Sequence, residues 1–407
     1  MKLKTISTSV LFALLPTTGA LAAAMDRSGQ SIAAFLQPKN YFEAGITILD
    51  PTVGGVTTDG AKVTDMGDDY YFPSAALKFQ LNDNFSFGLL YDQPFGAAAK
   101  YTDGGKYTGT NVEVNSNNLT AIVGFQPNEN LNFYGGGVYQ DVRGDLTLSS
   151  VGTGYKANFK RDEGYGWLAG AAYQIPEIAL KASITYRSEI DHELETTESM
   201  PTLAATLAGI TAMGGNVPTS PLYPTWMQLA GANAIINSGA ASKDTKITTP
   251  QSVNLDFQTG IMANTVAFAN VRWVEWGGMQ IDIDKFRKLT AANGLNGGKG
   301  ENIIEYSKDQ WSANIGVGRK FNDLFSGTFS VGWDSGAGNP VTALGPTEGY
   351  WNVGIGGQFS PTPATFIGAG VKYFWLGDAD GRSAGQPVGR FEDNEAIAYG
   401  LKMGYRF

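Results

Sequence analysis

Residues 396–407, at the end of the chain, read AIAYGLKMGYRF. The odd-numbered residues of this stretch are all apolar or aromatic, and the even-numbered ones are small apart from the cations Lys402 and Arg406. Successive side chains of a β-strand point to opposite faces, so the stretch predicts a strand with one wholly apolar face. A soluble sandwich would bury that face against a second sheet. A membrane barrel would turn it to lipid and keep the other face in the lumen.

The same alternation recurs along the chain in about fourteen segments bounded by turn residues. The predicted strands begin near Tyr41, Tyr71, Phe85, Val114, Leu131, Gly164, Ile178, Ile247, Thr265, Ile304, Phe325, Glu348, Ala364 and Glu395. Their connections are alternately short and long. We therefore predict an all-β protein, a transmembrane up-and-down antiparallel β-barrel with short periplasmic turns and long extracellular loops. A soluble, exported all-β protein stays an alternative.

The composition excludes several classes of function. The 407 residues include no cysteine and one histidine, which removes disulfides and most thiolate or imidazole metal sites. A net charge of −9 disfavours nucleic acid as a partner, because phosphate neutralisation needs clustered cations. We expect no metal, no cofactor and no enzymatic activity. His192 is expected to be solvated at a strand end, and the sequence places no nucleophile beside it.

The first 24 residues have the pattern of a secretory signal peptide. Lys2 and Lys4 precede an apolar stretch, 6–15, and a small-residue segment, 19–24, offers cleavage after Ala22 or Ala24. The mature chain would then divide into a short N-terminal segment, 25–39, and the barrel, 40–407. The predicted location is the outer membrane of a Gram-negative bacterium, in contact with its lipid, and we expect a monomer.

The longest connection contains 44 consecutive residues, 199–242, without a charged side chain. Residues 202–213 and 225–236 could form short helices in it, separated by glycine and proline. Contiguous exposed apolar surface usually marks an interaction site. The residues predicted to form a hydrophobic docking surface are Leu203, Leu207, Ile210, Leu222, Tyr223, Trp226 and Met227. A self-packed cap that binds nothing is the alternative.

Several cations fall on the faces predicted to line the lumen. They are Lys181, Arg187, Arg272, Lys308, Lys372, Lys402 and Arg406. We expect most of them to pair with carboxylates, for which Glu43, Asp92 and Glu189 have suitable positions. One or two could hold a ligand carboxylate instead. The candidates are Arg187, Lys308 and Lys402, and Arg187 is the strongest because it ends a strand next to the uncharged loop.

Short motifs distributed over most of the chain resemble those of one family, the outer-membrane long-chain fatty acid transporters of the FadL family. The motifs are TYRSE at 185–189, ILDPTV at 48–53, Pro250 after the long loop, RWVEW at 272–276, Lys308-Asp309, and Trp333-Asp334-Ser335 followed by Pro340-Val341. The resemblance implies a fourteen-stranded barrel plugged from within by its N-terminal segment. It also implies docking of hydrophobic ligand between outer loops, transfer to an internal pocket and sideways release through the wall.

The N-terminal segment departs from the family pattern, because it is short and lacks the family's Asn-Pro-Ala sequence. Ile32, Phe35 and Leu36 could still form a small apolar plug. The predicted function is passive uptake of hydrophobic molecules, with long-chain fatty acids as the preferred substrate. Alternatives are uptake of neutral aromatic hydrocarbons, a weakly selective open porin for polar solutes, and a surface adhesin.

Overall fold

A computed structural model describes residues 24–150 and 154–407. Its central feature is a closed antiparallel barrel of fourteen strands. The strands are β1 (Tyr41–Thr52), β4 (Tyr70–Gln80), β5 (Phe85–Asp92), β7 (Asn111–Phe125), β8 (Leu131–Leu148), β9 (Tyr155–Ile175), β10 (Leu180–Arg187), β14 (Ser252–Met262), β15 (Thr265–Val274), β18 (Gln310–Lys320), β19 (Phe325–Asp334), β21 (Tyr350–Phe359), β22 (Thr365–Leu376) and β25 (Glu395–Arg406). Each pairs with the next in this order, and β25 pairs with β1 to close the cylinder. The predicted fold class is confirmed.

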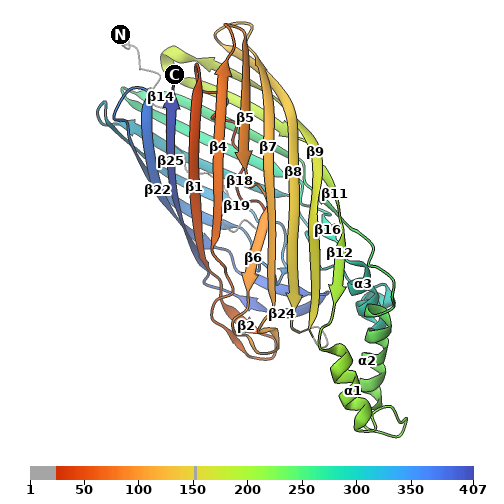
Figure 1. Ribbon diagram of the computed structural model, residues 1–407. Helices are drawn as coiled ribbons and strands as arrows, with labels where there is room; N and C mark the ends of the chain where they lie inside the picture. Colours follow the sequence, from red (N-terminus) through yellow and green to blue (C-terminus); the bar gives the residue numbers. More distant parts are fainter. Residues whose placement is uncertain (1–23, 151–153) are drawn as a thin grey trace.

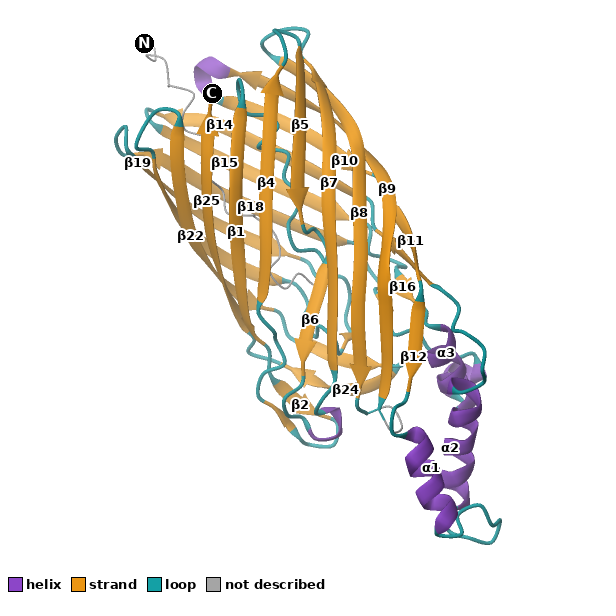
Figure 2. Cartoon of the chain, in the orientation of Figure 1, coloured by secondary structure: helices purple, strands orange, loops and turns teal. Residues whose placement is uncertain are grey.

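The two ends of the barrel differ as the connection lengths predicted. The short turns lie at the end that carries the C-terminus, and the long connections gather at the opposite end (Figure 1). In an outer-membrane barrel the short turns face the periplasm. Figure 2 shows that all three α-helices stand at the long-loop end.

The outward side chains of the strands are apolar. In β25 the predicted outward residues from Tyr399 to Phe407 are exposed, whereas Ala396 and Ala398 are buried inside. Tryptophans gather near the loop end, where Trp351 stands opposite both Trp333 and Trp375 in register. Such aromatic girdles mark the interface of a membrane with water.

The long connections pack together as a cap. A five-stranded sheet is formed by β2 (Gly55–Thr57), β3 (Lys62–Val63), β20 (Val341–Thr342), β23 (Ala379–Ser383) and β24 (Gln386–Phe391). Two smaller ribbons pair β11 (Ile190–Leu194) with β13 (Thr245–Thr249) and β16 (Gln280–Ile281) with β17 (Ile304–Glu305). The strand β12 (Thr196–Ser199) extends the barrel beside β9, and β6 (Gly96–Lys100) lies beside β7.

The helices belong to the long connections. They are α1 (Leu203–Ala212), α2 (Tyr223–Ile236) and α3 (Asp284–Ala292). Turns of 3-10 helix occur at Gly105–Tyr107 and Leu295–Gly298 in long connections and at Pro176–Ile178 in the short turn between β9 and β10. Among the described residues no helix is long and apolar enough to cross a membrane. The predicted signal peptide, except for Ala24, lies outside the described residues.

Candidate functional site

The barrel wall is interrupted between β4 and β5. Pairing between these strands ends at Ala75 and Tyr91, although β4 continues to pair with β1 as far as Tyr70. After Asp92 the chain leaves the wall, and it resumes as β6, which pairs with β7 along its length and is joined on its other side by a single bridge between Ala99 and Gly67 (Figure 1). Pro73 lies on the unpaired edge of β4, a position where the missing N–H of proline is tolerated.

The N-terminal segment occupies this interruption from the inside. The backbone of Met25–Arg27 runs beside residues 94–96, with hydrogen bonds from Arg27 N–H to Pro94 O at 2.6 Å and from Gly96 N–H to Met25 O at 2.9 Å. The guanidinium of Arg27 lies 4.0 Å from the ring centroid of Tyr70. The Tyr70 hydroxyl bonds to both backbone groups of Ala98, at 2.7 and 2.8 Å, and so bridges β4 to β6.

A buried ion pair fixes the segment to the opposite wall. Arg272 Nε donates to Asp26 Oδ2 at 2.7 Å, and both side chains are almost fully buried. The remaining guanidinium nitrogens of Arg272 donate to Asn254 Oδ1 at 2.7 Å, Gln30 Oε1 at 3.1 Å and Ser252 Oγ at 3.2 Å. Asp26 and Gln30 come from the segment, so Arg272 binds the segment at two points.

Further along, the segment makes a short turn whose apolar side chains face the barrel wall. Ile32, Phe35 and Leu36 are all buried, and Phe35 packs edge-on against Tyr134 at 5.8 Å between ring centroids. A Cβ at Gly88 or Gly124 would lie within 3 Å of the Phe35 ring, so these glycines admit it to the wall. The structure therefore brings the three residues predicted as a plug together inside the barrel.

Two lysines hold the end of this turn. Lys78 Nζ donates to the carbonyl oxygen of Gln37 at 2.5 Å, and Lys181 Nζ donates to that of Leu36 at 2.7 Å. The predicted carboxylate partners for lumen cations are therefore replaced here by backbone carbonyl groups.

Three cavities within the described residues lie along the N-terminal segment. The largest, a lumenal cavity of about 180 Å³, is bordered by segment residues from Ser28 onward and by both strands at the wall interruption. A middle cavity of about 40 Å³ is bordered by Asp26 and Arg27. An upper cavity of about 40 Å³ has an almost wholly apolar lining that includes Phe95 and Val142. Met25 borders both of the smaller cavities. The segment thus stands between the upper cavity and the lumenal one.

Arg187, at the end of β10, borders the lumenal cavity. It is buried, and its Nη1 atom has no hydrogen-bond partner among the described residues. Both amide atoms of Asn314 in the same lining are likewise unpartnered within the described ranges. Buried polar groups are nearly always hydrogen-bonded, so these atoms are available to a polar ligand or to water in the cavity.

The other two candidate cations are placed differently. Lys402 borders the lumenal cavity but pairs with Glu43 at 3.0 Å. The alternation of inward and outward residues predicted that both side chains face the lumen and could pair. Lys308 is exposed at the loop end, outside the cavity. Its predicted inward orientation is wrong, because the barrel strand begins at Gln310 and not near Ile304.

Two other carboxylates of the lumenal cavity, those of Asp92 and Asp256, accept hydrogen bonds from neutral donors. Asp92 accepts from Ser28 Oγ at 2.5 Å, and Asp256 accepts from Asn270 Nδ2 at 2.7 Å. Glu189, the third predicted partner, is exposed and does not border the cavity. Arg187 is therefore charged, buried and without a direct ion pair among the described residues.

The uncharged loop folds into a helical hairpin, α1 and α2, close to the predicted bounds. Leu203 is buried at its base, so it is unavailable as docking surface. The other predicted docking residues, namely Leu207, Ile210, Leu222, Tyr223, Trp226 and Met227, are partly or fully exposed. The rings of Tyr223 and Trp226 stack, with their centroids 6.0 Å apart.

His192 contradicts the expectation that it is solvated. It is buried in β11, with Nε2 at 2.9 Å from Gln140 Oε1 and Nδ1 at 3.3 Å from Asp162 Oδ2. Burial lowers the pKa of its imidazole, although the Asp162 carboxylate partly opposes that shift. The pattern of alternation gave no sign of this, because β11 lies in the cap, where both faces of a strand can be covered.

A closed barrel with an apolar outer face, an internal segment and an interrupted wall defines an outer-membrane channel. The family described as "Outer membrane protein transport protein (OMPP1/FadL/TodX)" matches residues 20–407. The chain belongs to this family, whose members are non-enzymatic outer-membrane channels for hydrophobic molecules. The resemblance predicted from the motifs is confirmed.

Solved structures share the fold at low sequence identity. A Pseudomonas aeruginosa FadL homologue is 15% identical, with a TM-score of 0.71 over 97% of this chain and 99% of its own. The Pseudomonas putida toluene transporter TodX is 14% identical, with a TM-score of 0.61 over 97% and 99%. The Ralstonia pickettii toluene transporter TbuX is 11% identical, with a TM-score of 0.55 over 96% and 92%. No protein with a curated description matches the sequence.

Proposed function

We propose that the protein carries long-chain fatty acids passively across the outer membrane. The α1–α2 hairpin captures the ligand, the upper apolar cavity takes its tail, and the lumenal cavity receives its carboxylate. The interrupted wall between β4 and β5 then provides a sideways exit into the membrane. No energy source is required, because an apolar molecule enters lipid downhill.

The observation that carries the proposal is the buried guanidinium of Arg187 beside the lumenal cavity, whose Nη1 atom has no hydrogen-bond partner among the described residues. An arginine binds a carboxylate with charge-assisted hydrogen bonds, which are stronger than neutral ones. A neutral hydrocarbon would leave this buried charge unsatisfied. A cavity of about 150 Å³ holds only a benzene-sized molecule. The lumenal cavity, at about 180 Å³, is only slightly larger, so it would take the carboxylate end of a fatty acid while the tail extends beyond it.

The proposal is tested by comparing two ligands of equal chain length, a fatty acid and the corresponding alkane, in proteoliposomes. Arg187→Gln should raise the KM for the fatty acid roughly tenfold to a hundredfold, the value of one hydrogen bond to a charged group. Alkane uptake should not change. Lys372→Gln is the matched control, because Lys372 is also buried and inward-facing but does not border the cavity. Equal effects of Arg187→Gln on both ligands would contradict the proposal.

Uptake of neutral aromatic hydrocarbons is the second candidate, favoured by the apolar lining of the upper cavity. TodX and TbuX, which share the fold, are toluene transporters by description. This candidate predicts that toluene enters faster than a fatty acid and that Arg187→Gln leaves toluene uptake intact.

A further inference from the structure

The α1–α2 hairpin projects beyond the rim of the barrel (Figures 1 and 2), and it packs against the cap through α2 from Gln228 onward. It lies within residues 199–242, which carry no charge. Surface helices of soluble proteins normally present charged residues to water. An uncharged projecting hairpin therefore lacks the usual means of solvation.

The apolar residues of the hairpin are not confined to one side. Met213, Val217 and Met227 are about half exposed or more, at 65%, 47% and 52%. In α1 the residues Ala204, Ala205, Ala208 and Ala212 are also exposed, on a different side of the helix from Leu203, Leu207 and Ile210. A helix that is apolar all round is typical of a fully covered environment, and a groove for one ligand would cover only one face.

Three polar side chains of the hairpin, Thr206, Thr211 and Trp226, bond to partners within it, whereas Gln228 bonds to Asn293 of the cap. The hydroxyl of Thr206 donates to Thr202 O at 2.9 Å. The hydroxyl of Thr211 donates to Leu207 O at 2.7 Å and accepts from Trp226 Nε1 at 2.9 Å. Internal satisfaction of polar groups is what an apolar medium demands, because no water is present there to bond them.

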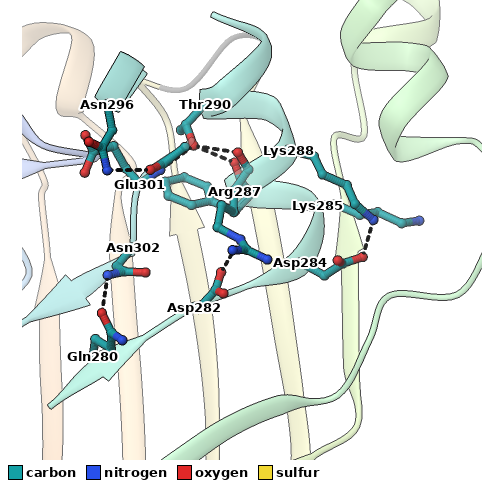
Figure 3. Close-up of polar contacts among 12 residues, drawn as sticks. Gln280, Asp282, Asp284, Lys285, Arg287, Lys288, Thr290, Asn296, Glu301 and Asn302 are labelled. Carbon is teal, nitrogen blue, oxygen red and sulfur yellow. Dashed lines mark hydrogen bonds and ion pairs between the residues drawn. The ribbon is translucent and has the colours of Figure 1, made fainter. Parts of the chain in front are cut away.

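Charged side chains occur again directly at the base of the hairpin. There α3 contains the ion pair Asp284–Lys288 at 2.7 Å, and its Arg287 pairs at 3.1 Å with Asp282, which precedes the helix; Figure 3 shows both pairs and the polar contacts of Thr290. Lys285 Nζ donates to Ile236 O, the carbonyl at the end of α2, at 2.9 Å. The base of the hairpin therefore presents charged side chains to water, whereas the tip presents none.

We propose that the hairpin inserts into the apolar interior of dispersed substrate, a droplet or aggregate of hydrocarbon chains outside the cell. This inference rests on the proposed function and adds the physical form in which the substrate is met. Insertion desolvates no charge, whereas each carboxylate placed in hydrocarbon is strongly disfavoured. Molecules then enter the cavities directly from the apolar phase, without passing through water one at a time.

Because the chain has no cysteine, Met213→Cys allows one polarity-sensitive dye to be attached at the tip. The full-length protein is held in lipid nanodiscs, and hexadecane emulsion is added. The emission should shift to the blue with emulsion and stay unchanged with fatty acid below its aggregation concentration. Val56→Cys, exposed in the β2 strand of the cap, should not respond. A shift already present in the disc alone would place the hairpin on the bilayer and overturn the proposal, as would a shift caused by monomeric fatty acid.

Uptake separates this inference from the proposed function. The double variant Met213→Glu, Val217→Glu, which leaves every predicted docking residue in place, should lose about tenfold or more of its uptake from emulsion, because both charges must leave water. Uptake of the same fatty acid delivered singly by cyclodextrin should be unchanged, and Val56→Glu should change neither. Equal uptake from emulsion by variant and parent would overturn immersion while leaving the channel intact. If the parent protein itself takes up no fatty acid delivered by cyclodextrin, the proposed function is refuted instead.

Discussion

Neutralising Asp26 should release the front of the N-terminal segment from the wall. In Asp26→Asn the shape is kept, but the Arg272 guanidinium loses its only carboxylate among the described residues. Removing one member of a buried ion pair costs about 3–5 kcal/mol. If that cost falls on the docked state, the ratio of released to docked segment rises by roughly a hundredfold to several thousandfold.

The loss should be local. Residues 32–37 keep the packing of Phe35 and the hydrogen bonds from Lys78 and Lys181, so only residues 25–30 should detach. Amide exchange of Arg27 and Gly96, whose N–H groups join the segment to residues 94–96, should accelerate by the same factor. In planar bilayers, the steady ionic conductance should rise from near zero as the path between the cavities opens.

Two variants make the test specific. The double change Asp26→Asn, Arg272→Gln removes both charges together and should restore slow exchange and low conductance, because replacing both partners is far milder than orphaning one. Glu195→Gln breaks the exposed pair Lys160–Glu195 and should change neither measurement. Low conductance and slow exchange in Asp26→Asn itself would show that the ion pair does not hold the segment. High conductance in the unaltered protein would favour the open porin.

Other changes test the remaining parts of the path. Trp226→Ala and Leu222→Ala should each lower fatty acid uptake several-fold while the barrel still folds, as judged by heat-modifiable migration on gels; unaltered uptake kinetics would remove the hairpin from the mechanism. Phe35→Ala should loosen the buried turn by about 3–5 kcal/mol, seen as faster exchange of its amides. The lowered pKa of His192 keeps its imidazole neutral in the folded cap, so the stability of β11 and β13 should be full above about pH 6.5 and should fall on acidification. Exchange of their amides should then rise at pH 5, and His192→Gln should flatten that dependence.

The barrel could be predicted because lipid enforces a simple rule on each strand. Outward residues must be apolar, so alternation survives wherever a strand is in the membrane. The prediction failed where a strand leaves the membrane. β9 begins at Tyr155, ahead of the predicted Gly164, because its extension carries Lys156, Lys160 and Arg161 on outward positions in water. Ile304 was misassigned for a related reason, since it pairs with Ile281 in a small ribbon of the cap.

The site could be predicted only in part. The alternation of side chains between the two faces of a strand correctly predicted that Arg187, Arg272 and Lys402 point into the lumen, because it depends only on neighbouring residues of the same strand. It could not give the partner of Arg272, since Asp26 lies 246 positions away in the chain. The wall interruption did leave a signal. Pro73 within one predicted strand and Pro94 after the next are residues that central strands avoid. Taken together, they would have marked an edge in a barrel that should have none.

That edge explains why the N-terminal segment can be short. Backbone groups facing lipid must be hydrogen-bonded, and a strand edge in the membrane is therefore costly unless something covers it. Three residues, Met25–Arg27, supply backbone partners to residues 94–96, and the Tyr70 hydroxyl supplies both bonds to Ala98. A permanent hole would leave these groups unpaired, and a continuous wall would block sideways exit. A segment held at one edge by few hydrogen bonds, and at the far wall by one ion pair and the hydrogen bonds of Arg272 and Asn254, can uncover the interruption without unfolding a strand.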